Sequence, residues 1–520
     1  MRKLVALFLS LVMILSMLVA CSQPTDVHAD ESPKETNAPA SGDNENNEST
    51  PMESESEPVE ETEELSEYDK IGIPELNYGD ATINIASWYA ENPEFEVSVE
   101  ELDGDPILDA IYKRNLYTEQ TLGVELEFLP IPGAGNQSEI ISWCETAKNM
   151  QSDPATPVDI LACYSRTAAY ATINGLNQDL TVYNNLDLSK EWWPKNVQEE
   201  FSIGNRLFFI TGDISTNVLH MMYCVFYNKV ILNDHGLDDP VELVNNKAWT
   251  IDAWQNMTKD LYEDVDGVPG KSAGDVYGAT FQYFYLDAVI QGSGFKLLEG
   301  SNKDGEHLAV TEDFYSQKFD NYIAQMIEWV QSNDVWSDID YGAKGSTEKA
   351  FREGRSAFQL MRATFGFQLS ETDLEYGILP PPMYDTSVQE EYITTLGNPY
   401  TMYSLSGSTK DGERAAAVLQ TMGYYGYSLT TPAIFEVTFK GKFSKDPNAI
   451  EMFNVIRESI GFDLGILYSK ELNGMCDLPT MNAISKGQQW STVANNAFAK
   501  KTMQTKLDRL NKSLDAVVNS

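Results

Sequence analysis

The sequence is poor in basic residues. Its 520 residues contain 36 Lys and Arg against 79 Asp and Glu, which gives a formal net charge of −43. Proteins that bind nucleic acid neutralise its phosphates with Lys and Arg, so this balance excludes nucleic acid as a partner. It also disfavours an anionic ligand, unless a local pocket overrides the charge of the whole chain.

Cysteine and histidine are scarce as well. Five cysteines are too few for a disulfide scaffold, and the absence of a Cys-x-x-Cys pair excludes zinc-ribbon and thioredoxin motifs. The four histidines form no His-Glu-x-x-His motif. Asp264 and Asp266 lack the other ligands of a calcium loop, and Gly267–Ser272 has too few residues between its glycines for a phosphate loop. We therefore expect no metal and no cofactor.

The N-terminal segment predicts export. Arg2 and Lys3 precede an apolar run over 4–20, which is typical of a secretory signal peptide, 1–20. The run ends in Leu-Val-Ala-Cys21, and these four residues resemble the bacterial lipobox, which implies that Cys21 carries a lipid and begins the mature chain. An uncleaved transmembrane anchor is the alternative, although the run is short for a span of about 20 residues. We expect a protein held at the extracellular face of the cell membrane by its lipid.

Residues 21–74 have a different composition. Between 22 and 70 there are 16 Asp and Glu, only two cations, and mostly Ser, Asn, Pro and Thr otherwise. Such a segment buries too little apolar surface to fold alone. The composition predicts a solvated acidic tether between the lipidated Cys21 and the folded body.

From residue 81 onward, strand patterns alternate with helix patterns. The first strands are predicted at 81–86, 124–128 and 158–163, with helices between them over about 105–116 and 138–150. This order predicts a parallel sheet covered by helices. Further helices are predicted at 250–262, 318–331, 411–423, 447–460 and 503–518, and further strands at 221–226, 276–281, 357–361 and 401–404.

Aromatic residues are abundant, with 26 Tyr, 22 Phe and 9 Trp. Most such rings pack in cores, but those just past the carboxyl ends of parallel strands lie where open α/β sheets bind ligands. Trp88 and Tyr89, in a predicted loop, fit this rule, as do Tyr164 and Ser165. Rings with polar groups around them suit sugars, because C–H faces stack on the ring and hydroxyls need hydrogen-bond partners.

Several stretches resemble the extracellular solute-binding lipoproteins of bacterial ABC importers that are classed as carbohydrate-binding family 1. Tyr227–Lys229, Gly236–Pro240 and Trp249-Thr250 are similar to a segment that leads into a helix of the second lobe. Phe351–Phe358 resembles a signature in which a helix leads to a buried strand, and 441–465 resembles a C-terminal stretch of Gram-positive members.

The resemblance implies an α/β, two-lobed, periplasmic-binding-protein-like fold of type II. Each lobe would be a mixed, mostly parallel sheet flanked by helices, with the ligand cleft at the hinge. Lobe 1 would comprise 75–212 and 393–432, and lobe 2 would comprise 213–392 and 433–520. Such a protein is not an enzyme. It captures a small molecule, most often a sugar, and presents the closed lobes to the ABC transporter permease subunits. We expect a monomer.

The candidate ligand-binding residues lie at strand ends, at the two crossings between lobes, or where family members often place an aromatic ring. They are Trp88, Tyr89, Tyr164, Ser165, Thr216, Asn217, Tyr283, Tyr285, Arg362, Thr364, Phe365, Asn398, Tyr400 and Trp490. For each of them the alternative is packing, and Arg362 has the further alternative of pairing with a buried Asp.

Two other functions stay open at this point. The negative charge of the chain fits a binding protein for peptides or polyamines, and the acidic and aromatic residues fit a lipid-anchored polysaccharide-degrading enzyme. Two carboxylates about 5–10 Å apart in the cleft would favour the enzyme. The four cysteines after Cys21 lie in apolar contexts and are predicted to be core thiols, although bridges between them are an alternative: Cys144, Cys163, Cys224 and Cys476.

Overall fold

The computed structural model describes residues 65–89, 96–102, 104–133, 135–299, 307–337, 346–438, 447–476 and 478–519. The predicted signal peptide, Cys21 and the tether up to residue 64 lie outside these residues, as do 441–446 of the C-terminal resemblance. Among the helices of the described part, none has both the length and the apolar character needed to cross a membrane.

The end of the predicted tether is folded. Residues Glu67–Ile71 form helix α2, capped by the side chain of Ser66. Ile71 and Ile73 are buried in the core, and the side-chain amide of Gln420 donates to the carbonyl of Ile71. The boundary at residue 74 is therefore wrong, because these two isoleucines give the segment an apolar face to bury.

Lobe 1, as we call the part built on the first sheet, has four strands in the order β11-β3-β1-β2. The inner strand β1 pairs in parallel with β2 and β3, and β11 pairs antiparallel with β3, which confirms a mixed, mostly parallel sheet. The strands are β1 (Ala81–Tyr89), β2 (Val124–Pro132), β3 (Ile160–Tyr164) and β11 (Thr401–Leu405).

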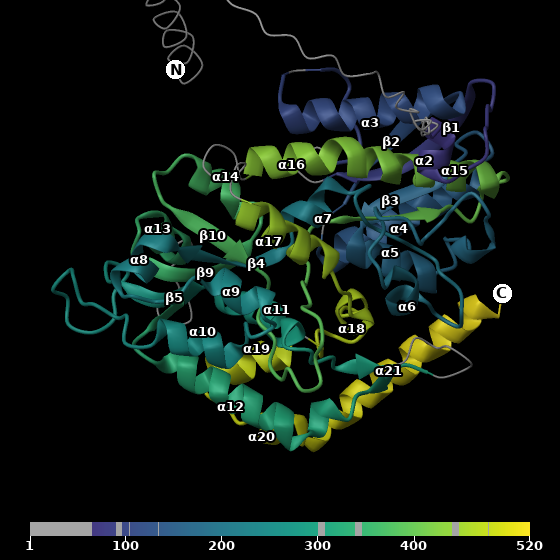
Figure 1. The fold of residues 1–520 in the computed structure, drawn as a ribbon. Coiled ribbons are helices and arrows are strands. Elements are labelled where there is room, and N and C mark those ends of the chain that lie inside the picture. The colour runs from purple at the N-terminus through teal and green to yellow at the C-terminus, as the bar shows by residue number, and fades with distance from the viewer. Residues whose placement is uncertain are drawn as a thin grey trace, which may run out of the picture. The chain divides into compact units, whose positions relative to one another are not determined.

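Helices follow the strands of lobe 1 as the sequence predicts. Asp105 caps α3 by accepting from the amides of Ile107 and Leu108, and Asn136 caps α4. In Figure 1, α3 and α16 lie side by side, and the two are in contact. The helices are α3 (Pro106–Leu122), α4 (Gln137–Ser152), α5 (Ser165–Ile173), η1 (Leu180–Val182), α6 (Val197–Phe201), α15 (Gly412–Tyr425), η5 (Gly426–Thr430) and α16 (Thr431–Thr438).

Lobe 2 is built on a five-stranded sheet in the order β10-β4-β9-β5-β8. Strand β5 pairs in parallel with β8 and β9, whereas β4 pairs antiparallel with β9 and β10. This sheet is mixed but less parallel than the resemblance implied, because β4 enters it against the direction of β9. The strands are β4 (Tyr223–Asn228), β5 (Tyr277–Phe281), β8 (Val335–Ser337), β9 (Ser356–Arg362) and β10 (Tyr376–Leu379); β6 (Leu298–Glu299) and β7 (Ala309–Val310) form a separate ribbon.

The core of lobe 2 is aromatic. Trp254 packs edge-on against Trp329, and Trp249 stacks on Phe358 of β9. The helices around this core are α8 (Lys229–Asp234), α9 (Pro240–Asn245), α10 (Ile251–Thr258), η2 (Tyr283–Tyr285), α11 (Leu286–Gly292), η4 (Asp313–Tyr315), α12 (Gln317–Gln331), α13 (Ser346–Arg352), α14 (Phe365–Ser370), α17 (Pro447–Glu458), α19 (Leu478–Ser485) and α20 (Trp490–Ala494).

The C-terminal region does not belong to lobe 2 alone. Helix α18 (Leu464–Leu467) and helix α21 (Ala497–Val518) both contact α5 of lobe 1, and α21 also contacts α20. Figure 1 shows α21 as the long yellow helix that ends at the C-terminus. The predicted boundary at 433–520 misses this sharing, because a helical pattern shows which face is apolar but not which lobe covers it.

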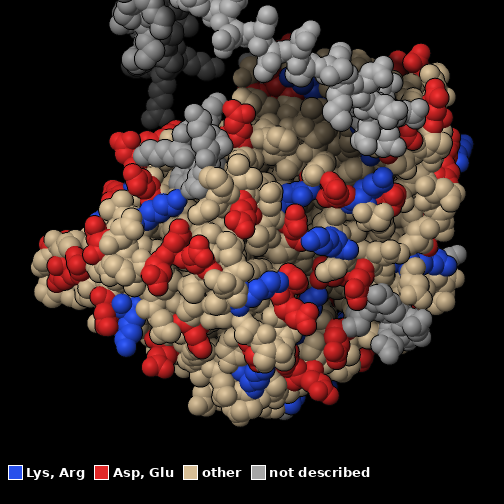
Figure 2. Space-filling view, viewed as in Figure 1, with Lys and Arg blue, Asp and Glu red and all other residues tan. Residues whose placement is uncertain are grey.

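The four cysteines of the described part are buried, which confirms the prediction of core thiols. Burial raises the pKa of Cys144 to about 12. Many acidic residues are instead on the surface: on the face shown in Figure 2, Asp and Glu side chains are spread widely, with Lys and Arg scattered among them.

Candidate functional site

The chain crosses between the lobes along strands that lie side by side. Ile210 forms an antiparallel bridge with Tyr403 at the lobe 1 end, and Met222 forms one with Leu396 at the lobe 2 end. A third crossing follows α17, where Ile460 bridges Thr394 in parallel. These paired segments form the hinge, and both predicted crossings, at Thr216-Asn217 and at Asn398–Tyr400, belong to it.

Lobe 1 brings strand ends to the hinge. Trp88 and Tyr89 are the last residues of β1, in register with Ile131 and Pro132, so the prediction that they open a loop is wrong. The indole of Trp88 donates to the hydroxyl of Thr401 at 2.7 Å, and its ring meets that of Tyr164 edge-on at 5.7 Å. Tyr89 is 41% exposed.

The next strand end is bonded directly to the second crossing. Ser165 donates its hydroxyl to the side-chain carbonyl of Asn398 at 2.8 Å and its amide to the carbonyl of Tyr400 at 3.1 Å. Tyr400 is buried, with its ring 6.5 Å from that of Phe462. The structure thus brings Trp88, Tyr164, Ser165, Asn398 and Tyr400 together.

Lobe 2 contributes an arginine held between rings. The guanidinium of Arg362, at the end of β9, lies 5.8 Å from the ring centre of Tyr223 and 5.4 Å from that of Tyr285. Its Nε is buried without a hydrogen-bond partner, and within the described part of the chain it forms no ion pair, so the alternative of a buried Asp partner is not what the structure shows. Tyr283 is 36% exposed beside this group.

Arg362 and Tyr164 lie near each other across the hinge. Burial raises the pKa of Tyr164, and the positive charges of Arg166 and Arg362 oppose that rise. A Cβ added to Gly397 on the second crossing would come within 2.5 Å of the Nε of Arg362. The ends of β3 and β9 therefore face the same region, one from each lobe.

The short helix α7 (Thr216–His220) supplies polar groups at the first crossing. Thr216 and Asn217 are buried, and the hydroxyl of Thr216, the Nδ2 of Asn217 and the Nε2 of His220 have no hydrogen-bond partner among the described residues. Burial lowers the pKa of His220 to about 4, so its ring is neutral. Thr364 joins this group through its amide, which donates to the carbonyl of His220 at 3.0 Å.

Glu96 is a site residue that the sequence analysis missed. It is buried, and one of its oxygens accepts from Ser215 and from the amides of Asn217 and Thr401, while the other accepts from the hydroxyl of Thr401 at 2.6 Å. Burial raises the pKa of Glu96, and the hydrogen bonds lower it. The carboxylate of Glu96 therefore connects the two crossings by hydrogen bonds. No sequence motif around Glu96 indicates this role.

Two candidates are packing residues. Phe365 is fully buried against Phe226 and Phe351. Trp490 is buried between Phe314 and Phe319, and its indole donates to the carbonyl of Phe314. We remove both from the candidate site, because their rings are surrounded by the core of lobe 2.

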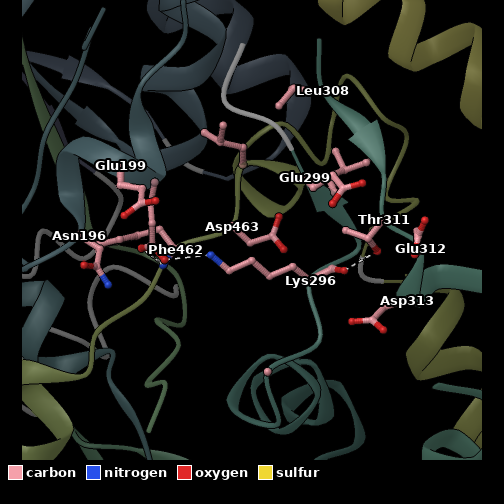
Figure 3. A pocket seen from close by; sticks show the side chains of 14 residues that line it. Asn196, Glu199, Lys296, Glu299, Leu308, Thr311, Glu312, Asp313, Phe462 and Asp463 are labelled. Atoms are coloured by element: carbon pink, nitrogen blue, oxygen red, sulfur yellow. Dashed lines mark hydrogen bonds and ion pairs between the residues drawn. The ribbon is translucent and has the colours of Figure 1, made fainter. Parts of the chain in front are cut away.

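A cavity of about 970 Å³ lies apart from these residues and contains none of the candidates. Figure 3 shows Lys296 reaching across it from Thr311 toward Phe462, and its ammonium lies 2.9 Å from Glu200. The other charged groups around this ion pair are acidic: Glu199, Glu299, Glu312, Asp313 and Asp463.

A loop of lobe 2 gathers three carboxylates whose oxygens lie within 4.8 Å of one another, from Asp264, Asp266 and Asp275. Asp275 already accepts from the amide of Ser272 and the hydroxyl of Tyr262. Ser272 also stands in a Gly-x-Ser-x-Gly spacing at 270–274, but its hydroxyl donates to Asp266 in a loop that follows no strand, unlike a nucleophile elbow. We assign neither a metal nor a catalytic role to this loop.

Comparisons with known proteins give the fold. No family model and no curated protein matches the sequence. Among solved structures, the chain is similar to the maltose-binding protein MalE of Listeria monocytogenes in complex with maltose (14% identity, TM-score 0.54, 83% of this chain and 98% of that one). It is similar to a sugar transporter from Rhizobium etli in an open conformation (12%, TM-score 0.55, 82% and 99%).

A third similar structure is a family 1 extracellular solute-binding protein from Bifidobacterium longum subsp. infantis (14% identity, TM-score 0.52, 83% of this chain and 100% of that one). The three matches cover 82–83% of this chain and 98–100% of the other chains. They confirm the two-lobed periplasmic-binding-protein-like fold that the sequence resemblance implied.

Proposed function

We propose that this chain is a lipid-anchored, extracellular substrate-binding protein that captures a sugar or oligosaccharide between its lobes and delivers it to the permease of an ABC importer. The observation that carries the proposal is the convergence at the hinge of unpartnered polar atoms and aromatic rings. Asn217 and His220 come from the first crossing, Tyr164 from lobe 1, and Arg362 and Tyr285 from lobe 2.

Unpartnered buried polar atoms cost free energy, about 1–3 kcal/mol each, and ligand hydroxyls would recover it. The indole of Trp88 and the ring of Tyr164 offer apolar faces beside these polar atoms, which is the combination that a pyranose needs. Solved structures of similar fold bind maltose in one case and are described as a sugar transporter in another.

The two other functions fit the site less well. A polyamine would meet the positive charge of Arg362, which no described acidic side chain neutralises by an ion pair. For glycoside hydrolysis, Glu96 would have to face a substrate, but both of its oxygens already accept hydrogen bonds from the crossings. We therefore propose binding without turnover.

The test is a thermal-shift screen of the full chain against mono- and oligosaccharides, peptides and polyamines, with product analysis of every hit. A ligand that binds only the folded state stabilises it by about 2.7 kcal/mol at a hundredfold excess over Kd. Saccharide binding without turnover is expected. Hydrolysis of a glycan, or a shift with peptides or polyamines alone, would refute the proposal.

A pair of variants tests the location of the site. Asn217→Ala removes a side-chain amide whose Nδ2 has no partner among the described residues and should raise Kd about tenfold, whereas Asn233→Ala changes an exposed residue of α8 and should leave Kd unchanged. Equal affinities of the two variants would place the ligand elsewhere.

The anchor is tested separately. Cys21→Ser removes the thiol that the lipobox resemblance assigns to the lipid, so the protein should no longer incorporate a radiolabelled fatty acid in a bacterial host. Incorporation that persists in Cys21→Ser would contradict the anchor and leave the ligand proposal unaffected.

A further inference from the structure

The hinge region holds cations in a strongly acidic chain. The sequence has only 36 Lys and Arg. One of them, Arg362, lies at the end of β9 with its guanidinium over two tyrosine rings. The negative charge of Asp287 raises the pKa of Arg362, but the two side chains form no ion pair in the described structure. An arginine stays charged in a protein, so this site holds a positive charge that lies over two rings, is hydrogen-bonded to Tyr223 and has no carboxylate at ion-pair distance among the described residues.

Lys470 is a second cation of the same region, on the segment that follows α18. Its ammonium nitrogen is buried and has no hydrogen-bond partner among the described residues. Burial and the nearby positive charge of Arg166 both lower the pKa of Lys470. The positive charge of Arg166 also lowers the pKa of Tyr164, and the positive charge of Arg362 does the same. Helix α18, just before Lys470, contacts α5, which begins at Ser165 directly after β3. Lys470 is therefore on the segment that packs at the end of β3.

The acidic groups near Lys470 neutralise it only in part. Glu471 and Glu139 act on it through space, but neither forms an ion pair with it in the described part of the chain. Burial raises the pKa of Glu471 to about 7, so this carboxyl is partly protonated near neutral pH. Two positive charges thus remain without a bonded counter-charge.

Removing charges from water is costly unless an opposite charge and hydrogen bonds replace the water. A guanidinium presents a planar set of donors that matches carboxylate and sulfate oxygens. Neutral sugars need no such group. The arrangement is what an anionic ligand would complete when the lobes close.

We infer that the captured ligand is an acidic saccharide, and that Arg362 binds its carboxylate or sulfate while Lys470 contributes a second positive charge. The inference rests on the proposed function and narrows it from sugars in general to sugars that carry an anionic group.

The experiment is isothermal titration calorimetry on the full chain with three probes: a galacturonate trisaccharide, a sulfated chondroitin disaccharide and neutral maltotriose. An acidic probe should bind more tightly than maltotriose, and its affinity should fall as salt is added. Comparing the galacturonate and chondroitin probes distinguishes a carboxylate from a sulfate as the preferred group.

Variants assign the preference to the two cations. Arg362→Gln should raise the Kd of the acidic probe about 10- to 100-fold, Arg362→Lys should have a smaller effect, and Lys470→Gln should raise Kd as well. The matched control is Arg352→Gln, which removes the same charge from an exposed position on α13 and should change nothing. Because Lys470→Gln and the salt dependence are independent measurements, the test survives if Arg362→Gln fails to fold.

The outcomes separate the two proposals. Tight binding of maltotriose with no preference for the acidic probes overturns the acidic-saccharide inference and keeps the proposed function. A preference for the acidic probes that is unchanged in Arg362→Gln and Lys470→Gln would likewise overturn the inference and keep the proposed function. If no saccharide of either kind binds, the proposed function itself fails.

Discussion

A buried ion pair joins the first and third crossings of the hinge, and its removal should destabilise the protein strongly. Arg457 of α17 places Nε 3.1 Å from each oxygen of Asp213 and Nη2 2.6 Å from one of them. The side chains are 12% and 5% exposed. Thr431 also donates to Asp213, and Arg457 donates to the carbonyl of Glu191.

Asp213→Asn leaves the guanidinium buried without a counter-charge. Removing one partner of such a pair costs about 3–5 kcal/mol, whereas replacing both partners with apolar residues of similar volume is often neutral. We therefore expect Asp213→Asn and Arg457→Met each to lower the free energy of unfolding by about 3–5 kcal/mol, and the double variant Asp213→Leu/Arg457→Met to recover most of that loss.

The assay is urea unfolding of the full chain, followed by tryptophan fluorescence. Lys195→Met is the matched control. The ammonium of Lys195 lies 3.2 Å from Glu458, which is on α17 like Arg457, but the two side chains are 72% and 53% exposed. That variant should change the free energy of unfolding by less than about 1 kcal/mol. Single variants at Asp213 as stable as the control, or a double variant as unstable as the singles, would refute the reasoning.

Three further predictions follow from burial. The pKa of His220 is about 4 in the fold and about 6.5 when unfolded, so the unfolded chain binds more protons at this site between these values. The contribution of His220 to stability should be constant above pH 6.5 and fall below it by up to about 1.4 kcal/mol per pH unit, and it is measured as the difference between the urea titrations of the unmodified chain and of His220→Gln. Trp490→Ala should lower the free energy of unfolding by about 3–5 kcal/mol in the same assay but leave ligand affinity unchanged, since the ring packs in lobe 2. The four buried thiols should resist a thiol reagent in the folded protein and react once urea unfolds it; fast reaction of Cys144 without urea would contradict its burial.

Long periodic elements were predictable from the sequence. The helices expected at 318–331 and 503–518 are α12 and the greater part of α21, and the strands expected at 124–128 and 401–404 are within a few residues of β2 and β11. Short elements such as β8, β10, α14 and α18 went unseen, because three to six residues are too few to show a period. Their structure depends on tertiary contacts that the local sequence does not encode.

The candidate site was predictable where a topological rule applied. Tyr164 and Ser165 follow a buried parallel strand, and the rule that ligands bind at such ends places them at the hinge. Trp490 is buried among other rings, and this could not be predicted, because an aromatic ring looks the same in sequence whether it faces a core or a cleft. Glu96 and Lys470 were missed for a different reason: Glu96 bonds Thr401, 305 positions away, and no local pattern reports such a contact.

The negative charge of the whole chain favours a cationic ligand, whereas the positive charges at the hinge favour an anionic one. The distance of each set of charges from the ligand decides which effect is stronger. Surface carboxylates such as those in Figure 2 act on a ligand through water, and at physiological ionic strength their field decays over about 8 Å. Arg362 and Lys470 would touch the ligand in a site from which water is excluded when the lobes close, where an interaction is screened far less. The contact cations therefore outweigh the distant carboxylates once the ligand is bound, while the acidic surface slows its approach. An acidic saccharide should accordingly bind with an association rate that rises with added salt and a dissociation rate that rises more steeply, so that its affinity falls. A neutral sugar should show no salt dependence of either rate in stopped-flow measurements. An association rate that falls with salt would show that the field of the hinge extends beyond the cleft, and would contradict this separation of near and far charges.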